Sequence, residues 1–365
     1  MKFYHTADIH LGAVPDRKES WSRQREKEIW ENFYRLLDRA KSENVDLVLI
    51  CGDLFHRQPL RRELNDLNYH FSKIEPVRVV MIAGNHDYIS ENSLYRDYSW
   101  SSNVRFLASS TCEYVYLEDL NTCIYGCSYH MREKTEPIYD SLRPEKVNAR
   151  FDSLPKDCCH ILMAHGGDDK HIPIDEKKLA QNGFDYVALG HIHKPRLSFE
   201  QNLAYAGALE PIDPNDEGIH GFIEGQTRGS EVSFHFVPFS KWSYVTLRVK
   251  VHSAMSFEEM KDVIRSGMKE LEKDQEGQQL IYKVILEGTK SLDLVWDEDE
   301  INALGNILSL TDETDYDLDI EKLYRENQGN LLGQYIEKVM QMDLDPQKRQ
   351  KVLFYGLDAL YNRDL

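Results

Sequence analysis

Short apolar runs alternate with helical stripes along the N-terminal part of the chain. The runs cover residues 2–7, 47–51 and 77–83, and the stripes cover residues 26–41 and 63–74. Residues 47–51 are apolar without interruption, which is typical of a strand buried on both faces of a parallel sheet. The stripes place their apolar residues on one helical face, as in helices packed against a sheet. Successive units of this kind predict an α/β layered domain.

The middle of the chain is richer in strand patterns. Predicted strands cover residues 114–117, 123–129, 160–164 and 186–189, two short segments at 203–206 and 221–224 resemble hairpin strands, and residues 232–239 alternate. This pattern closes a first domain at residues 1–240.

The pattern changes after residue 240. Residues 242–251 and 280–286 predict strands, and residues 256–273 predict a helix whose start carries a capping box, Ser256 followed by Glu259. We therefore expect a small α+β domain at residues 241–319. An acidic stretch at residues 312–319 would separate it from a C-terminal helical segment, residues 320–365, with helices at 320–340 and 346–361.

Charge and composition narrow the class of protein. The net charge is −18, and about two-thirds of the acidic excess follows residue 250. Such a charge argues against broad non-specific binding of nucleic acid, although a local basic groove remains compatible with it. The six cysteines lack the spacing of a disulfide framework, and neither a membrane span nor a signal peptide is visible. We expect a cytoplasmic protein that does not associate with a membrane.

Polar side chains follow five of the predicted strands. In chain order they are Asp8 and His10, Asp53, Asn85 and His86, His165, and His191 and His193. A lone histidine or a Gly-Asp pair is usually structural, but here the polar groups recur at the same end of successive strands. Bringing this many carboxylates and imidazoles together carries a large desolvation cost unless a cation neutralises them. The sequence therefore predicts a metal site.

The types of ligand restrict the ion. Asp, Asn and His without thiolates suit manganese, iron or zinc rather than calcium or magnesium, which prefer oxygen ligands throughout. The seven potential ligands are too many for one ion, and two ions require a bridging carboxylate. Such a pair activates water for in-line attack on phosphorus.

His86 is a candidate catalytic residue, because an imidazole offers a proton near neutral pH. Its neighbour Asp87 is a candidate to orient it, although a carboxylate in this position also caps turns.

The motif set resembles the calcineurin-like metallophosphoesterases over residues 1–240. The matching motifs are Asp8-x-His10, Gly52-Asp53, Gly84-Asn85-His86-Asp87, His165 and Gly190-His191-x-His193. The segments 52–56 and 190–195 resemble the SbcD branch of DNA double-strand-break repair nucleases. The Asp-Arg-Gly of the protein phosphatase branch is absent, since Phe55-His56-Arg57 stands in its place.

The resemblance implies a fold and a role for each residue. The fold would be a four-layer α/β/β/α sandwich, followed by a capping domain and C-terminal helices. Asp8, His10 and His193 would hold one ion, Asn85, His165 and His191 the other, and Asp53 would bridge them. His86 would stabilise the transition state or protonate the leaving oxygen, and His56 would contact the scissile phosphate. We expect two divalent ions, manganese first, with iron or zinc as alternatives.

The resemblance further implies a DNA exonuclease or endonuclease that acts at DNA ends, forms a homodimer and works with an SbcC-like ATPase. Residues 63–74 and 88–100 would contribute to the dimer, and the C-terminal helices would dock on the ATPase. Tyr69, Tyr88, Tyr95 and Trp100 fit either an interface or the core. Two alternatives stay open: a phosphodiesterase or nucleotidase for small substrates, which the acidic charge favours, and a scaffolding subunit of an ATPase complex.

Overall fold

The computed structural model describes residues 1–275, 277–291, 294–317 and 320–361. The chain divides into two compact units. Unit 1 comprises Met1–Tyr244 together with Gly277–Gln279, and unit 2 contains the other described residues from Val245 onward. Within the described ranges, no helix is long and apolar enough to span a membrane.

The first sheet of unit 1 has six strands in the order β12-β11-β1-β2-β3-β4. Their bounds are β1 Lys2–Thr6, β2 Leu47–Cys51, β3 Arg78–Ile82, β4 Val104–Phe106, β11 Gly221–Arg228 and β12 Glu231–Pro238. Strands β1 to β4 are parallel, and β11 pairs antiparallel with both β1 and β12. The carboxyl ends of β1, β2 and β3 therefore lie along one edge.

The second sheet also has six strands, in the order β5-β6-β7-β8-β10-β9. Their bounds are β5 Glu113–Leu117, β6 Thr122–Gly126, β7 Cys159–His165, β8 Tyr186–Gly190, β9 Arg196–Ser198 and β10 Leu203–Tyr205. Strands β6, β7, β8 and β10 are parallel. The segments at 203–206 and 221–224 are hairpin strands as predicted, each in its own sheet: β10 pairs antiparallel with β9, and β11 pairs antiparallel with β12. Both are central strands, and both begin with buried residues.

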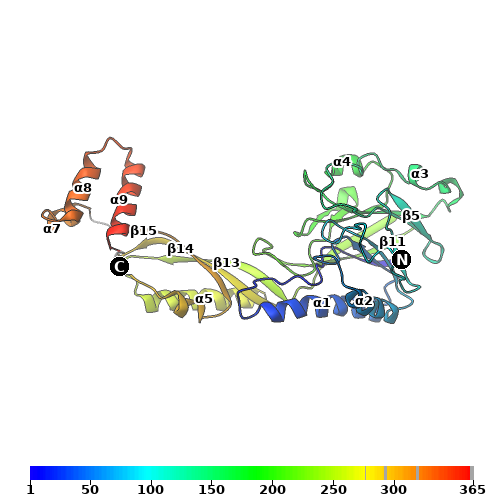
Figure 1. Cartoon of the computed structure of the whole chain (residues 1–365), viewed down its shortest axis with the longest axis horizontal. Coiled ribbons are helices and arrows are strands. Elements are labelled where there is room, and N and C mark those ends of the chain that lie inside the picture. The colour runs from blue at the N-terminus through cyan, green and yellow to red at the C-terminus, as the bar shows by residue number, and fades with distance from the viewer. Residues whose placement is uncertain (276, 292–293, 318–319, 362–365) are drawn as a thin grey trace. The chain divides into compact units, whose positions relative to one another are not determined.

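Unit 1 forms the four layers that were expected. The two sheets face each other across a core that includes Leu49 and Val80 from one and Ile161 and Met163 from the other. Helices α1 (Ser22–Ser42) and α2 (Arg61–Lys73) cover the outer face of the first sheet. The short helices α3 (Pro144–Val147) and α4 (Glu176–Leu179) lie on the opposite side, over the second sheet (Figure 1). Three 3₁₀ turns complete the unit, at Glu118–Leu120, Phe151–Ser153 and Phe199–Gln201.

Unit 2 contains a three-stranded sheet covered by a helix. Strands β13 (Trp242–Val251), β14 (Gln279–Lys290) and β15 (Ile307–Tyr316) form the sheet, of which Trp242–Tyr244 and Gln279 belong to unit 1, and α5 (Phe257–Asp274) packs against it. The short helix α6 covers Glu298–Asn302. The predicted capping box is confirmed: Ser256 accepts a hydrogen bond from the Glu259 N–H, and the Glu259 side chain accepts one from the Ser256 N–H.

The interpretation of residues 312–319 as a separating stretch is wrong in part. Residues 312–316 belong to β15, which pairs in parallel with β14. Basic residues of the same sheet offset the acidic charge: Lys290 on β14 binds the carboxylate of Asp312, and Arg248 on β13 approaches Glu313. Residues 318–319, where that stretch ends, lie outside the described residues.

The predicted helix at 320–340 is two helices. Helix α7 covers Ile320–Glu326 and α8 covers Leu331–Gln341, whereas α9 covers Pro346–Tyr361 as predicted. The break occurs because Asn330 caps α8, its side chain accepting hydrogen bonds from the N–H groups of Leu332 and Gly333. A polar turn at residues 327–330 therefore interrupts an apolar stripe that continues across it.

Candidate metal centre

The predicted ligands follow strands whose ends meet at one edge of the two sheets. Asp8 and His10 follow β1, Asp53 follows β2, and Asn85 follows β3. In the second sheet, His165 ends β7, and His191 and His193 follow β8. The segments after β1 and β2 stay paired beyond the strands, since the His10 N–H donates to the Asp53 carbonyl at 3.0 Å. Two sheets thus supply ligands to one place.

The backbone at this edge is strained. Asp8, His10, Asp53 and His191 have φ values of 49°, 52°, 48° and 94°. A positive φ is uncommon for residues other than glycine and costs free energy that the surrounding structure must offset. The strain turns four predicted ligands out of the extended path of their strands.

The first group of potential ligands is Asp8, His10 and His193, whose ligand atoms lie within 4.8 Å of one another. The Nε2 atoms of His10 and His193 are 3.1 Å apart and face each other. One Asp8 oxygen accepts a hydrogen bond from the His191 N–H at 2.8 Å. Within the described chain the other, Oδ1, is buried and has no hydrogen-bond partner. A buried carboxylate oxygen without a partner fits a cation ligand, because the desolvation cost is otherwise uncompensated.

The second group is Asn85, His165 and His191, and the ligand atoms of Asp53 and the two histidines lie within 4.8 Å of one another. The Asn85 Oδ1 lies 2.9 Å from His165 Nε2 and 3.1 Å from His191 Nδ1. His165 Nδ1 donates to the Cys51 carbonyl at 2.9 Å, so Nε2 is the nitrogen that carries the lone pair when the imidazole is neutral. The second group therefore offers one amide oxygen and two imidazole nitrogens around a common point.

Asp53 lies between the groups. Its Oδ2 is 3.4 Å from His165 Nε2 in one group and 3.9 Å from His10 Nε2 in the other. Its Oδ1 accepts a hydrogen bond from the His86 N–H at 2.8 Å. Burial alone would raise the pKa of Asp53, but the imidazoles of His165, His10 and His86 hold that pKa well below its usual range. The carboxylate stays charged and contacts both groups.

The other pKa shifts show that the centre favours positive charge. Burial raises the pKa of Asp8 to about 6. Burial lowers the pKa values of His165 and His193, but nearby carboxylates outweigh it and raise each to about 9. Protons on the two imidazoles thus compensate buried negative charge, a role that divalent cations fill more effectively. The donor set fits two divalent cations.

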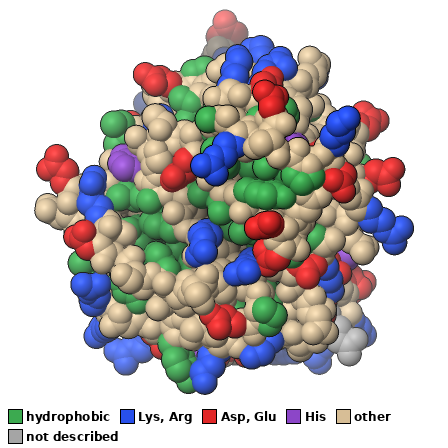
Figure 2. Space-filling model, turned by 90° about the vertical axis from the view of Figure 1, so that its right-hand side faces the viewer, with side chains coloured by type: hydrophobic (Ala, Val, Ile, Leu, Met, Phe, Trp, Pro, Cys, Tyr) green, Lys and Arg blue, Asp and Glu red, His purple; other side chains and the backbone are tan. Residues whose placement is uncertain are grey.

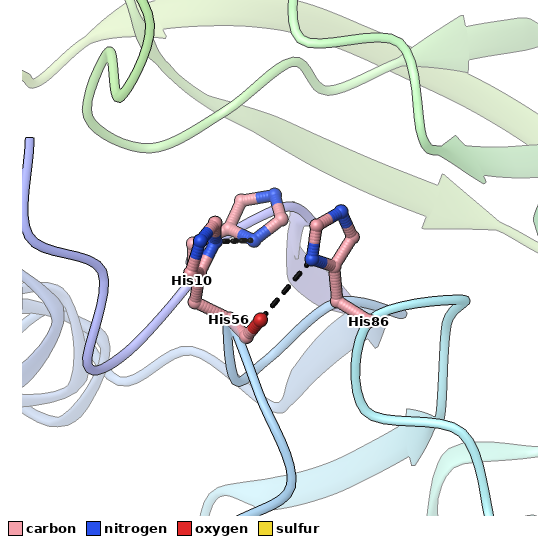
Figure 3. Close-up of side chains that lie close together, drawn as sticks. All are labelled: His10, His56 and His86. Atoms are coloured by element: carbon pink, nitrogen blue, oxygen red, sulfur yellow. Dashed lines mark hydrogen bonds between the residues drawn. The ribbon is translucent and has the colours of Figure 1, made fainter. Parts of the chain in front are cut away.

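The imidazoles of His10, His56 and His86 lie close together, and His10 also belongs to the first group (Figure 3). His56 Nδ1 is 3.3 Å from His10 Nδ1, and His86 Nδ1 donates to the His56 carbonyl at 3.1 Å. The rings of His56 and His86 stack with centroids 5.0 Å apart. Burial lowers the pKa of His56, assisted by the neighbouring His86. His56 and His86 are therefore neighbours of a ligand group.

A model of the calcineurin-like phosphoesterase family matches residues 1–195. The chain belongs to this family. It is therefore a metal-dependent phosphoesterase, and the family predicted from the motifs is confirmed. The match ends shortly after His193, so it includes every strand end that supplies the centre.

Several curated proteins resemble the chain over longer stretches. "Uncharacterized metallophosphoesterase YhaO" of Bacillus subtilis is 25% identical over 308 residues, 79% of this chain and 72% of that protein. "DNA double-strand break repair protein Mre11" of Methanocaldococcus jannaschii is 33% identical over 230 residues, 59% of this chain and 58% of that protein. Its counterpart in Saccharolobus solfataricus is 26% identical over 382 residues, 93% of this chain and 95% of that protein.

The expectation that Asp87 orients His86 is not met. The Asp87 carboxylate is buried and accepts hydrogen bonds from Gly84 N–H at 2.8 Å, Phe55 N–H at 3.2 Å and Tyr95 O–H at 2.9 Å. The His86 ring instead contacts the His56 carbonyl. Asp87 points into the protein because its side chain ties together the loops after β2 and β3.

Sequence patterns do not indicate three further residues at this phosphoesterase centre, which are Asp168, His171 and Asp216. Asp168 lies 2.8 Å from His191 Nε2 and 3.0 Å from His171 Nδ1, and Asp216 lies 3.0 Å from His193 Nδ1. Asp168 and Asp216 are each 23 residues from the predicted ligand they contact, and neither directly follows a predicted strand. The only signal for Asp168 is its place just after His165-Gly166-Gly167, and Asp216 has none.

Proposed function

We propose that this phosphoesterase is a two-metal nuclease that hydrolyses phosphodiester bonds at DNA ends. One observation supports this most strongly: two ligand groups flank Asp53, whose Oδ2 lies 3.4 Å and 3.9 Å from imidazoles of the two groups. The names of the archaeal relatives, which are DNA double-strand break repair proteins, favour DNA as the substrate.

In this proposal Asp8, His10 and His193 hold one ion, and Asn85, His165 and His191 hold the other. Asp53 bridges them. Manganese is our first expectation, because mixed oxygen and imidazole ligands without thiolate suit it. When bound, such a pair supplies an activated water and stabilises the oxygens of an in-line displacement at phosphorus.

The hydrogen bonds among the histidines indicate where protons lie when the first group holds an ion. With His10 Nε2 engaged, its Nδ1 carries the proton and donates to His56 Nδ1. His56 then carries its own proton on Nε2, as a donor for a phosphate oxygen. His86 donates from Nδ1 to the His56 carbonyl, so proton exchange with the leaving oxygen occurs at His86 Nε2.

The charge of the chain limits how it binds DNA. Lysines and arginines alternate with acidic residues on the face shown in Figure 2, without a continuous basic surface there. With a net charge of −18, we expect weak non-specific affinity and contacts confined to the surroundings of the centre. The same acidic charge is the observation that favours the second candidate, a phosphodiesterase for small substrates.

Hydrolysis of linear double-stranded and single-stranded DNA by the full chain with Mn²⁺ tests the nuclease. Asp53→Asn should reduce the rate by at least about 10³-fold, because a two-metal site loses its bridge. Asp119→Asn, which changes an exposed carboxylate paired with Arg78, is the matched control. The proposal fails if the wild-type protein leaves both DNAs intact, or if Asp53→Asn cleaves as fast as the control.

Competition separates the two candidate substrates. Both candidates hydrolyse bis-p-nitrophenyl phosphate, but only a nuclease should be inhibited competitively by DNA ends. Inhibition by mononucleotides and none by DNA would instead support the small-substrate enzyme.

We also propose that the chain forms a homodimer and binds an SbcC-like ATPase. Tyr69 on α2 is 56% exposed, whereas Tyr95 is buried. Of these two residues, Tyr69 is therefore the candidate for the dimer surface. On the C-terminal helices, Leu331 and Tyr355 are 64% and 68% exposed. Exposed large apolar side chains of this kind support contact with partner proteins.

Single substitutions test each contact separately. Tyr69→Glu should shift the full chain from dimer to monomer in light scattering, while Tyr355→Glu should leave the dimer intact. Tyr355→Glu should in turn prevent co-purification with a co-expressed coiled-coil ATPase. Unchanged assembly in either variant would contradict the corresponding contact.

A further inference from the structure

Both histidines of the segment His191-Ile192-His193 contact a carboxylate through the ring nitrogen that faces away from their ligand group. His193 Nδ1 lies 3.1 Å and 3.0 Å from the two oxygens of Asp216, while its Nε2 faces His10. His191 Nε2 lies 2.8 Å from Asp168, while its Nδ1 faces Asn85. The two imidazoles present opposite nitrogens to the centre, and each has its own carboxylate partner.

Asp216 is held in place independently of His193. Its side chain is 11% exposed, and its Oδ2 accepts hydrogen bonds from the N–H groups of Ile212 at 3.0 Å and Asp213 at 3.1 Å. The loop that carries it is anchored at its start, where the buried Arg25 donates to the Pro211 carbonyl. The carboxylate therefore has a fixed position before any ion binds.

Asp168 is fixed in a similar way, although its side chain is 46% exposed. Its Oδ1 accepts hydrogen bonds from the N–H groups of Lys170 and His171, each at 2.8 Å. Its Oδ2 contacts His191 Nε2 at 2.8 Å and His171 Nδ1 at 3.0 Å. Because the backbone N–H groups already engage Oδ1, this cluster fits a device that orients His191 better than it fits a third cation site.

We propose that Asp216 and Asp168 are positioning residues. Asp216 makes His193 present one defined nitrogen to the first ion, and Asp168 makes His191 present one defined nitrogen to the second. A carboxylate that accepts the outer N–H fixes the tautomer, so His193 offers Nε2 to the first group and His191 offers Nδ1 to the second. The proposal rests on the two-metal function above. Partners of this kind typically change metal affinity by about 10–100-fold.

The test measures Mn²⁺ binding to the full chain after chelation, by calorimetry and by electron paramagnetic resonance. Two Mn²⁺ ions about 3.5–4 Å apart are magnetically coupled. Asp216→Asn should weaken one ion by about 10–100-fold and, at limiting Mn²⁺, replace the coupled signal with that of an isolated ion. Asp168→Asn should weaken one ion to a similar extent, and the double variant should weaken both.

Asp213→Asn is the matched control for the Asp216 loop, because Asp213 contacts Asn215 and makes no described contact with a predicted ligand. It should bind both ions as the wild type does. Asp168→Asn keeps the proposal testable if Asp216→Asn fails to fold. The proposal is overturned if both folded single variants bind two ions with wild-type constants, or if either weakens both ions equally. Failure of the wild type to bind two ions would contradict the proposed function instead.

Discussion

Asp87 contributes to the centre by holding two loops rather than by contacting a reacting group. It accepts hydrogen bonds from Gly84 and Phe55, which lie on the loops that carry His86 and His56, and from Tyr95. All three groups donate hydrogen bonds to one buried carboxylate. The relative position of the two loops therefore depends on this carboxylate accepting them. An amide in its place presents a donor where an acceptor is required.

Asp87→Asn should therefore destabilise the protein by about 1–3 kcal/mol, the cost of leaving a buried polar group unsatisfied. Tyr95→Phe, which removes one of the three donors, should cost less, about 1 kcal/mol. Urea unfolding of the two variants measures both. Wild-type stability in Asp87→Asn would show that the loops are held by other contacts.

The burial of Glu210 predicts that the stability of the folded protein depends on pH. It is buried and accepts hydrogen bonds from Asn32, Lys241 N–H and Trp242 N–H. Burial raises its pKa from 4.5 to about 7, although the positive charges of Arg25 and Arg35 oppose the rise. The folded state thus binds the proton more tightly than the unfolded state. Its stabilising contribution is complete below pH 4.5 and is lost as the pH rises through 7.

Glu210→Gln removes this titration. Between pH 5 and 8 the free energy of unfolding should shift by about 2–3 kcal/mol in favour of the variant. The comparison is made with chelator present, so that metal binding does not contribute. Parallel pH profiles for the two proteins would contradict the buried titration.

Individual ligands were predictable where a polar residue directly follows an apolar run. Asp53 after residues 47–51 is the clearest case, and the same rule found Asp8, Asn85 and His165. Asp216 and Asp168 could not be found, because their partners are distant in sequence and only the folded chain brings them together. The expectation that Asp87 orients His86 was wrong for a related reason. Adjacency in the sequence says nothing about which way a buried side chain turns.

At the scale of elements, the ligands meet because small residues let the two sheets, and the ends of neighbouring strands, approach closely. A Cβ atom on Gly190 would lie 2.1 Å from the Cys51 carbonyl, and one on Gly84 would lie 2.2 Å from Asp53 Oδ1. Neither position tolerates a side chain without movement of its neighbours. The glycines of the motifs thus determine the distance between ligands of different strands.

Gly84→Ala should displace the Asp53 carboxylate and weaken Mn²⁺ binding by at least about 10-fold, because coordination tolerates only small shifts in ligand position. Calorimetric titration with Mn²⁺ measures the loss. Gly329→Ala, at a position where a Cβ would meet nothing within 4 Å, is the matched control. Equal affinities in the two variants would mean that Asp53 relaxes without leaving the centre.

Helices and strands were easier to predict from the sequence where they are fully buried. Strands β2 and β8, buried along their whole length, gave unambiguous apolar runs. Strand β15 was only partly predictable, because its acidic residues are paired with Lys290 and Arg248 on other strands of the same sheet. The break between α7 and α8 was missed because the apolar stripe continues on both sides of a polar turn.

At the scale of the whole molecule, each unit has its own hydrophobic core. The three clusters that hold the layers of unit 1 together contain residues of that unit. The cluster beneath β13, β14 and β15 includes Ile264 and Val284, and it belongs to unit 2. Units with separate cores can unfold in separate transitions.

A cavity made in one core should therefore destabilise mainly the unit that contains it. Ile264→Ala in unit 2 and Leu67→Ala in unit 1 both truncate fully buried side chains, and each should cost about 2–5 kcal/mol. Leu67→Ala should lower the temperature at which hydrolysis of bis-p-nitrophenyl phosphate is lost. Ile264→Ala should lower only a calorimetric transition and leave that temperature unchanged. If both variants lose hydrolysis at the same reduced temperature, the two cores unfold together.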